Sequence, residues 1–168
     1  MKLTITDRDL LFKPLQTVSG IVERRHTLPI LSNTLIEIRN GQLTLVTTDL
    51  EIEAEATSNI PELENQGTLQ TTVSVRKLQD ILRALPSGAA IELTRSENRL
   101  QIVSGKSRFS LQLLPAEDFP RMIRDSEPCS ATYTLAQRVL KKHLQRVAHA
   151  MAQQDLRYYL NGLLLLIE

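Results

Sequence analysis

Histidines and clustered carboxylates are the side chains of this sequence that could bind a metal ion or transfer a proton. The chain has three histidines, His26, His143 and His149. His143 and His149 are six residues apart, which places them on different sides of a helix, whereas a helical metal-binding pair has i,i+4 spacing. The spacing therefore predicts no metal ligand among the histidines.

Three glutamates alternate along a predicted strand, so that their carboxylates share one face of it: Glu51, Glu53 and Glu55. Such a face could hold a hard cation, but no histidine or further carboxylate cluster joins it, which favours a solvated strand face. The phosphate-binding GxxxxGK(S/T), dinucleotide-binding GxGxxG and hydrolase GxSxG motifs are absent from the sequence. We predict no catalytic residue, no metal and no cofactor.

Cysteine usage and hydropathy bear on the compartment. The single cysteine, Cys129, excludes an intrachain disulfide and fits a reducing cytoplasm. No apolar run approaches the roughly 18 residues that span a bilayer, and residues 1–7 lack the basic and apolar regions of a signal peptide. We expect a cytoplasmic globular protein without membrane contact, with an aliphatic core because aromatics make up only 4% of the chain.

A first segment begins with a strand at 3–5 and a helix. Thr6 or Asp7 is expected to cap the helix, Pro14 to give it a kink or a late start, and Gly20 to mark its end. Its apolar stripe is Leu10, Leu11, Leu15 and Val18.

Three strands complete this segment. They are predicted at 31–38, 42–47 and 49–56, and Asn40-Gly41 is a strong hairpin signal between the first two. Residues 58–69 are predicted to form a loop.

A second segment repeats the same order. A strand at 71–75 precedes a helix that Ser74 caps and that ends at 86–88. Its apolar stripe is Leu78, Ile81, Leu82 and Leu85. Strands are predicted at 91–94, 100–103 and 108–113.

A third segment follows a stretch at 115–130 whose prolines and charged residues predict a linker. It consists of a strand at 131–134, a helix at 135–151 and a strand at 158–167. The first and third segments align without a gap at an offset of 129, so that Leu11 falls on Leu140 and Leu15 on Leu144.

Repetition of one unit in a fixed order predicts a pseudo-symmetric α+β architecture with helices on one face and antiparallel sheets on the other. Two units make one domain. The predicted division is a first domain at 1–120, a linker at 121–130 and the incomplete start of a second domain at 131–168.

Net charge is only +1, but the charge is unevenly distributed. The windows 8–25, 74–85 and 136–149, which hold the predicted helices, are all basic, and 136–149 contains no acid. The strands at 35–56 carry five acids and one base. Basic helices could be ordinary solvated faces, or a surface that attracts phosphates without reading bases.

Four stretches, in order along the chain, resemble bacterial DNA sliding clamps, the beta subunits of DNA polymerase III. The first is Leu10-Leu11-Phe12-Lys13-Pro14-Leu15-Gln16-Thr17-Val18-Ser19-Gly20 with Arg25-His26-Thr27-Leu28-Pro29-Ile30-Leu31-Ser32-Asn33, and the second is Thr48-Asp49-Leu50-Glu51. The third is Gly105-Lys106-Ser107-Arg108-Phe109-Ser110-Leu111 with Leu114-Pro115-Ala116-Glu117-Asp118-Phe119-Pro120, and the fourth is Gln154-Asp155-Leu156-Arg157-Tyr158-Tyr159-Leu160-Asn161-Gly162.

The resemblance implies a three-domain subunit that dimerises head to tail into a ring, with helices lining the hole and sheets outside. A positive lining would let duplex DNA slide through unread. The DNA contacts that the resemblance implies are Arg24, Arg25, Arg76, Gln154, Tyr158 and Tyr159. Arg25 and Gln154 are also related by the offset of 129. Without the resemblance, the two tyrosines would be ordinary strand residues.

Two further surfaces are implied by the resemblance. A partner pocket that takes short peptides from the polymerase alpha subunit and the clamp loader matches Arg157, Tyr159 and Leu160, and its other walls come from sequence absent here. A homodimer interface matches the strand residues Phe109 and Leu111 and the helix residues Lys77 and Ile81. Phe109 could equally be a plain core residue.

Length is the departure from the family, because a clamp subunit is more than twice as long. We therefore expect a clamp fragment, a non-catalytic processivity factor that needs the rest of the ring to tether a polymerase. The alternative is a naturally truncated clamp-like interaction protein that binds a full-length clamp through Phe109 and Leu111. An enzyme acting on nucleic acid lacks any site for its chemistry.

Overall fold

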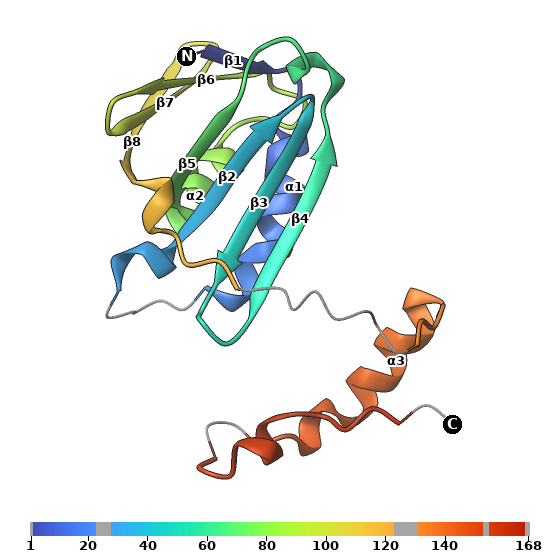
Figure 1. Cartoon of the computed structure of the whole chain (residues 1–168). Helices are drawn as coiled ribbons and strands as arrows, with labels where there is room; N and C mark the ends of the chain where they lie inside the picture. Colours follow the sequence, from blue (N-terminus) through green and yellow to red (C-terminus); the bar gives the residue numbers. More distant parts are fainter. Residues whose placement is uncertain (1, 23–27, 123–130, 153–154, 167–168) are drawn as a thin grey trace. The chain divides into compact units, whose positions relative to one another are not determined.

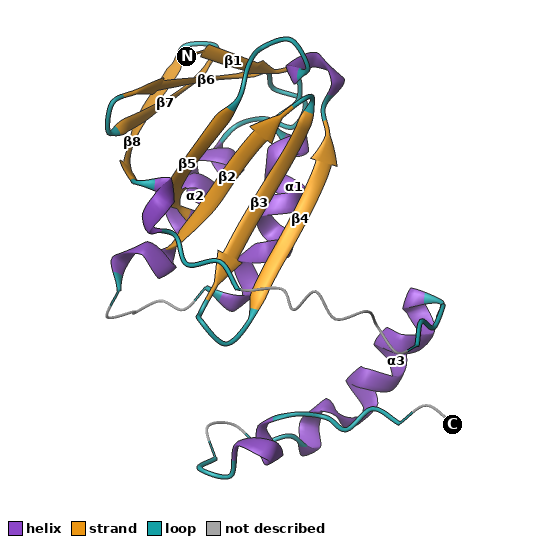
Figure 2. Ribbon diagram, in the orientation of Figure 1, coloured by secondary structure: helices purple, strands orange, loops and turns teal. Residues whose placement is uncertain are grey.

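The computed structural model describes residues 2–22, 28–122, 131–152 and 155–166, and the chain divides into two compact units, Met1–Arg124 and Asp125–Glu168. The strands of the first unit form one antiparallel sheet of eight, in the order β1-β6-β7-β8-β5-β2-β3-β4 (Figure 1). Their bounds are β1 Lys2–Ile5, β2 Asn33–Arg39, β3 Gln42–Thr48, β4 Glu53–Asn59, β5 Leu69–Ser74, β6 Ile91–Ser96, β7 Arg99–Ser104 and β8 Ser107–Leu114. Two helices, α1 (Asp9–Val18) and α2 (Val75–Ala84), cover one face of this sheet (Figure 2).

Within the first unit, the sheet confirms two repeated segments, each made of one strand, one helix and three strands. The first strand of each segment pairs with a strand of the other segment. Strand β1 pairs with β6, with Leu3 opposite Leu93, and β5 pairs with β2, with Thr72 opposite Leu35. The expected α+β architecture with helices on one side of antiparallel strands is therefore confirmed.

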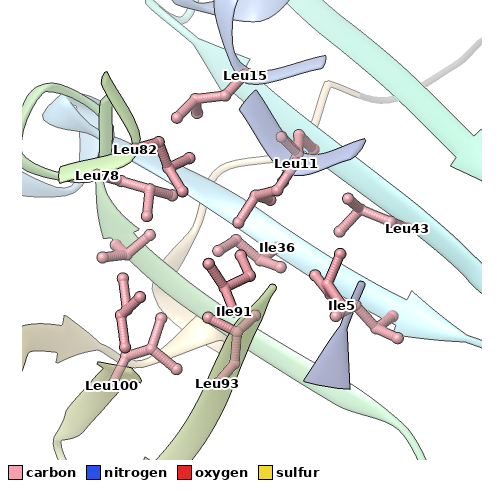
Figure 3. Close-up of a cluster of buried hydrophobic side chains, with 14 of the residues drawn as sticks. Ile5, Leu11, Leu15, Ile36, Leu43, Leu78, Leu82, Ile91, Leu93 and Leu100 are labelled. Atoms are coloured by element: carbon pink, nitrogen blue, oxygen red, sulfur yellow. The ribbon is translucent and has the colours of Figure 1, made fainter. Parts of the chain in front are cut away.

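Aliphatic side chains fill the space between sheet and helices (Figure 3). Alternation places one set of strand residues inside, and the helical stripes meet them. The fully or almost fully buried set includes Ile5, Leu11, Leu15, Ile36, Leu43, Leu78, Leu82 and Ile91. Each such side chain stabilises the fold by about 1.5–3 kcal/mol relative to exposure. The predicted aliphatic core is confirmed.

The predicted Ser74 cap of the second helix is confirmed, whereas the N-cap of α1 is Arg8, which makes no side-chain cap bond. Asp7, one residue earlier, bonds to the first turn of α1 instead. Asp7 Oδ1 accepts the N–H of Asp9 at 2.8 Å, and Ser74 Oγ accepts the N–H of Lys77 at 3.5 Å. The predicted late start of the first helix is wrong, because α1 begins at Asp9 and contains Pro14 as a buried residue. A short 3-10 helix, Ser19–Ile21, follows α1.

Turn chemistry decides the strand boundaries in the first unit. Asn40 and Gly41 have φ of +50° and +74°, which two-residue hairpins require, so that prediction is confirmed. The strand expected at 49–56 begins only at Glu53. Asp49 Oδ1 accepts the N–H groups of Glu51 and Ile52 at 2.9 and 2.7 Å, and these bonds replace strand pairing.

Other boundaries shift for similar local reasons. The residues expected to open the strand at 31–38 belong to the 3-10 helix Pro29–Ser32. Strand β4 runs into the loop expected at 58–69, and Pro61–Leu63 forms a 3-10 helix within that loop. The stretch expected at 115–130 to be a linker also begins too early. Its residues 115–122 pack on the first unit, where Phe119 is only 5% exposed.

In the second unit, the predicted helix is present as α3, Gln137–Val147, followed by the 3-10 helix Ala148–Ala150. The strands expected at 131–134 and 158–167 are wrong. Residues 131–136 have no regular structure, and Tyr158–Asn161 is a 3-10 helix. A strand needs a hydrogen-bonded neighbour, and the described residues of this unit offer none. None of the helices in the described part of the chain is long and apolar enough to cross a bilayer.

Candidate nucleic-acid interface and interaction surfaces

Exposed basic side chains gather on the helices, as the charge distribution predicted. On α2, Arg76 and Lys77 are exposed, and so are Arg83 and Asp80, whose charged groups lie 3.5 Å apart. On α3, all four basic residues are exposed and no acid accompanies them: Arg138, Lys141, Lys142 and Arg146. Ion pairs this exposed contribute little stability, so these charges remain accessible to phosphates.

Arg8 counts among the basic residues of the window 8–25, but its side chain faces inward. Its side chain is only 12% exposed, and its Nη1 and Nε donate to the carbonyl oxygens of Leu82 and Pro86 at 2.6 and 3.1 Å. Its guanidinium carbon also lies 4.9 Å from the centroid of the Phe12 ring. Arg8 therefore joins the start of α1 to the end of α2 and is not part of the exposed basic surface.

A depression of about 490 Å³ lies beside α2 and contains Arg76. Arg76 and Arg83, two helical turns apart, line it from α2, and Val22 and Ser32 line it from the segments that flank residues 23–27. Arg24 and Arg25 lie outside the described residues, but Val22 is only two positions from Arg24. One predicted DNA contact, Arg76, therefore lines the depression. Val22, which lies near Arg24 and Arg25 in the sequence, lines it as well.

The predicted DNA contacts of the second unit are less well defined. Gln154 and the side chain of Tyr158 lie outside the described residues, whereas Tyr159 is 67% exposed. Tyr158, Tyr159 and Leu160 lie in the same 3-10 helix.

Arg157 is held by the carboxylate of Asp155. Asp155 Oδ1 accepts the backbone N–H of Arg157 at 2.8 Å, and the guanidinium donates to both carboxylate oxygens at 3.1 Å. The hydrogen bonds from the Arg157 side chain, and then from its backbone, lower the pKa of Asp155. Asn161 closes this turn by accepting from the N–H of Asp155 and donating to its carbonyl, both at 3.0 Å.

The strand of the predicted dimer interface, β8, presents a partly open edge. It pairs with β7 from Ser107 to Gln112, but with β5 only at Leu113 and Leu114. Within the described part of the chain, the β5-side edge of Ser107–Gln112 has no strand beside it.

The predicted interface residues differ in their exposure. Phe109 is half-buried and packs against the core, Leu111 is buried at 6% exposure, Ile81 is half-buried on α2, and Lys77 is exposed. The structure therefore brings Phe109, Ile81 and Lys77 to an accessible region and assigns Leu111 to the core.

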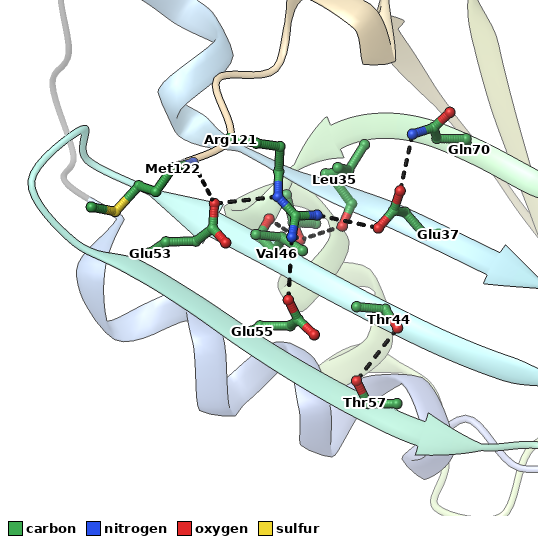
Figure 4. A network of polar contacts seen from close by, with 11 residues as sticks. Leu35, Glu37, Thr44, Val46, Glu53, Glu55, Thr57, Gln70, Arg121 and Met122 are labelled. Carbon is green, nitrogen blue, oxygen red and sulfur yellow. Dashed lines mark hydrogen bonds and ion pairs between the residues drawn. The ribbon is translucent and has the colours of Figure 1, made fainter. Parts of the chain in front are cut away.

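The acidic strand face differs from the expected solvated face. Glu51 belongs to a turn, whereas Glu53 and Glu55 lie on β4 with Glu37 nearby on β2. Arg121 reaches all three of these glutamates, with nitrogen–oxygen distances of 3.3 Å (Figure 4). No pattern in the sequence predicts this contact, because Pro120 and Arg121 belong to a stretch typical of a linker. Among the described residues, no group of three or more His, Cys, Asp or Glu could hold a metal ion.

Comparison with known proteins identifies the relatives of this chain. The family model of the DNA polymerase III beta subunit N-terminal domain matches residues 1–123. The beta sliding clamp of Pseudomonas putida is 47% identical over 165 residues, which cover 98% of this chain and 44% of that protein. The beta sliding clamp of Escherichia coli is 44% identical over 164 residues. The chain thus spans under half the length of these relatives.

Solved structures agree with the sequence relatives. A crystal structure of the DNA polymerase III beta subunit of Pseudomonas aeruginosa aligns with a TM-score of 0.86 at 44% identity, covering 96% of this chain and 43% of that one. The Caulobacter crescentus beta subunit aligns with a TM-score of 0.85 at 38% identity.

Proposed function

The chain belongs to the bacterial beta sliding clamp family, the beta subunits of DNA polymerase III, and we propose that it forms the first domain and part of the second of such a clamp. In this role it is a processivity factor, which encircles duplex DNA without reading its sequence and tethers the replicative polymerase. It acts in the cytoplasm and catalyses no reaction itself. The whole activity belongs to a full ring, of which this chain supplies part.

The exposed basic residues on one helix of each unit are the observation that carries this proposal. Exposed basic residues lie on α2 and α3, and Arg76 and Arg83 share one depression. Such a surface attracts the phosphate backbone through charge alone, so its affinity depends on salt and not on sequence. The DNA-contact set of the proposal is Arg24, Arg25, Arg76, Gln154, Tyr158 and Tyr159.

Ring formation is proposed to use the open edge of β8. Unpaired N–H and C=O groups along Ser107–Gln112 can accept another strand, as edge strands do. Phe109 beside that edge, with Lys77 and Ile81 on α2, would contact the second subunit of a homodimer. Leu111 supports this region from the core.

Partner binding is proposed to use Arg157, Tyr159 and Leu160 as one wall of a peptide pocket. The partners are short motifs of the polymerase alpha subunit and the clamp loader. Tyr159 and Leu160 are exposed at 67% and 36%, so their apolar surfaces are accessible. The remaining walls need sequence beyond this chain.

A second candidate is an interaction protein that binds a full-length clamp through the β8 edge. The open edge favours it, because one such strand could pair with a second subunit without closing a ring. Sedimentation of the chain mixed with a full-length clamp separates the two functions. A complex that Phe109→Glu abolishes supports this candidate, and the absence of a complex removes it.

The DNA-binding proposal is tested by fluorescence anisotropy with a short duplex at low salt. We expect Arg76→Ala to weaken binding, because it removes a phosphate partner from the helix face. Arg39→Ala is the matched control, since Arg39 is an exposed arginine at the end of strand β2. Equal affinities of the two variants would contradict a DNA surface on α2.

A further inference from the structure

A small second hydrophobic cluster lies on the sheet face opposite the helices, which we call the outer face. Leu35 on β2 and Val46 on β3 are opposite each other in register, and their neighbours Ile36 and Leu45 point into the main core. Phe119 covers Leu35 and Val46 and is 5% exposed. The chain beyond β8 therefore returns across the outer face and is held there by burial.

Arg121, two residues further on, crosses the same face. Its Nη1 contacts Glu37 on β2, its Nε contacts Glu53 on β4 and its Nη2 contacts Glu55 on β4. Strand β3 lies between these two strands, so the guanidinium spans it, close to Val46 (Figure 4). The backbone N–H of Met122 adds a hydrogen bond of 3.0 Å to Glu53 Oε2.

The charges explain why an arginine suits this position. Glu53 and Glu55 share a strand face and Glu37 lies across β3, so the three carboxylates repel one another unless a cation lies between them. The side chain of Glu53 is only 9% exposed, which raises the cost of leaving its charge without a partner. A planar guanidinium can address three carboxylates through separate N–H groups, whereas a lysine ammonium is a single point charge.

We propose that residues 116–122 form a strap across the outer face, and that Arg121 locks this strap by occupying a guanidinium site made by Glu37, Glu53 and Glu55. The strap holds the chain on the outer face as far as Met122. Phe119 anchors it by burial and Arg121 anchors it by charge.

The lock keeps the end of the strap on the sheet. Arg121 holds this end by charge, two residues beyond the buried Phe119. Arg121 is thus a positioning residue for residues 116–122, independent of any contact with DNA.

Amide hydrogen exchange on the whole chain, followed by NMR, tests this proposal. In Arg121→Gln we expect the amide of Met122 to exchange about tenfold faster, as the loss of several partly exposed ion pairs implies. The amide of Phe119, which donates to Ala116 O at 3.1 Å, should also exchange faster. Amides of β2 and β3 should keep their rates, which shows that the sheet is intact. Arg39→Gln removes the same charge from β2 and should leave residues 116–122 unchanged.

Two further comparisons decide between charge and burial as the lock. Arg121→Lys should give intermediate exchange, and added salt should accelerate exchange of the strap in the unmodified chain. If Arg121→Gln matches Arg39→Gln at Phe119 and Met122, while Phe119→Ala releases the strap, then burial alone holds it and the proposed role of Arg121 is wrong. Salt-insensitive exchange at Met122 would overturn the proposal in the same way, even if the substituted chains failed to fold.

Discussion

At the scale of single residues, three of the described arginines have structural surroundings that the sequence cannot distinguish. Arg76 is exposed in a depression, whereas Arg8 caps carbonyls at the end of α2 and Arg121 bridges three glutamates. In the sequence, each of the three arginines counts only as one positive charge within its range of residues. The carbonyl partners of Arg8 and the carboxylate partners of Arg121 lie more than 60 positions away in the sequence, and periodicity and local motifs do not reveal them. The predicted Ser74 cap, by contrast, rests on local chemistry and is confirmed.

Arg8 gives a prediction for stability. Arg8→Ala removes the donor to Leu82 O and Pro86 O and the cation beside Phe12, so we expect the first unit to lose about 1–3 kcal/mol of unfolding free energy. Urea unfolding followed by circular dichroism measures this loss. Lys13→Ala, an exposed basic residue of the same helix, should cost far less. Equal losses would show that the hydrogen bonds from Arg8 to Leu82 and Pro86 do not stabilise the fold.

Asp155 gives a prediction for pH dependence. Its pKa is lowered by Arg157, so the folded turn binds the proton more weakly than the unfolded chain, whose ordinary value is 3.8. The stabilisation of this turn is therefore present above pH 3.8 and is lost as the pH falls through the lower folded pKa. NMR titration of the Asp155 carboxyl carbon should show a higher midpoint in Arg157→Gln than in the unmodified chain. The same midpoint in both would contradict the contact.

At the scale of elements, helices and hairpins were predictable because their signals are local. The stripe Leu78, Leu82 and Leu85 and the Asn40-Gly41 turn appear where expected. The strand expected at 158–167 failed because strands require partners, and residues such as Leu164 are exposed instead, at 85%. The repeat makes the contrast clear: Leu15 is fully buried in α1, whereas its counterpart Leu144 in α3 is 41% exposed.

This contrast predicts unequal local stability. We expect the amides of α3 to exchange much faster than those of α1, since α3 buries none of its residues and is supported by fewer apolar contacts. Hydrogen–deuterium exchange with mass spectrometry compares the two helices in one sample. Equal protection of α1 and α3 would show that the second unit is as stable as the first.

At the scale of the whole molecule, the family was predictable from ordered motifs, and the fold followed from it. The net charge of +1 carried little information until it was divided between helices and strands. The prediction that the helices are basic is confirmed by the exposed basic residues of α2 and α3. The outer face is less negative than the sequence implied, because Arg121 occupies it.

The internal repeat predicts how two distant residues act together. Arg25 and Gln154 are related by the offset of 129, so we expect Arg25→Ala with Gln154→Ala to weaken binding to unrelated duplexes by the same factor. Anisotropy titrations with an A·T-rich and a G·C-rich duplex of equal length measure both factors. A loss confined to one duplex would indicate base contacts.

The central claim is that this chain contributes a phosphate-binding, sequence-blind surface to a sliding clamp. The most direct test is the affinity of the unmodified chain for two unrelated duplexes across a range of salt concentrations. We predict that log K falls linearly with log salt, with the same slope and similar affinity for both duplexes. Affinity that does not change with salt, or that differs strongly between the two sequences, would contradict the claim.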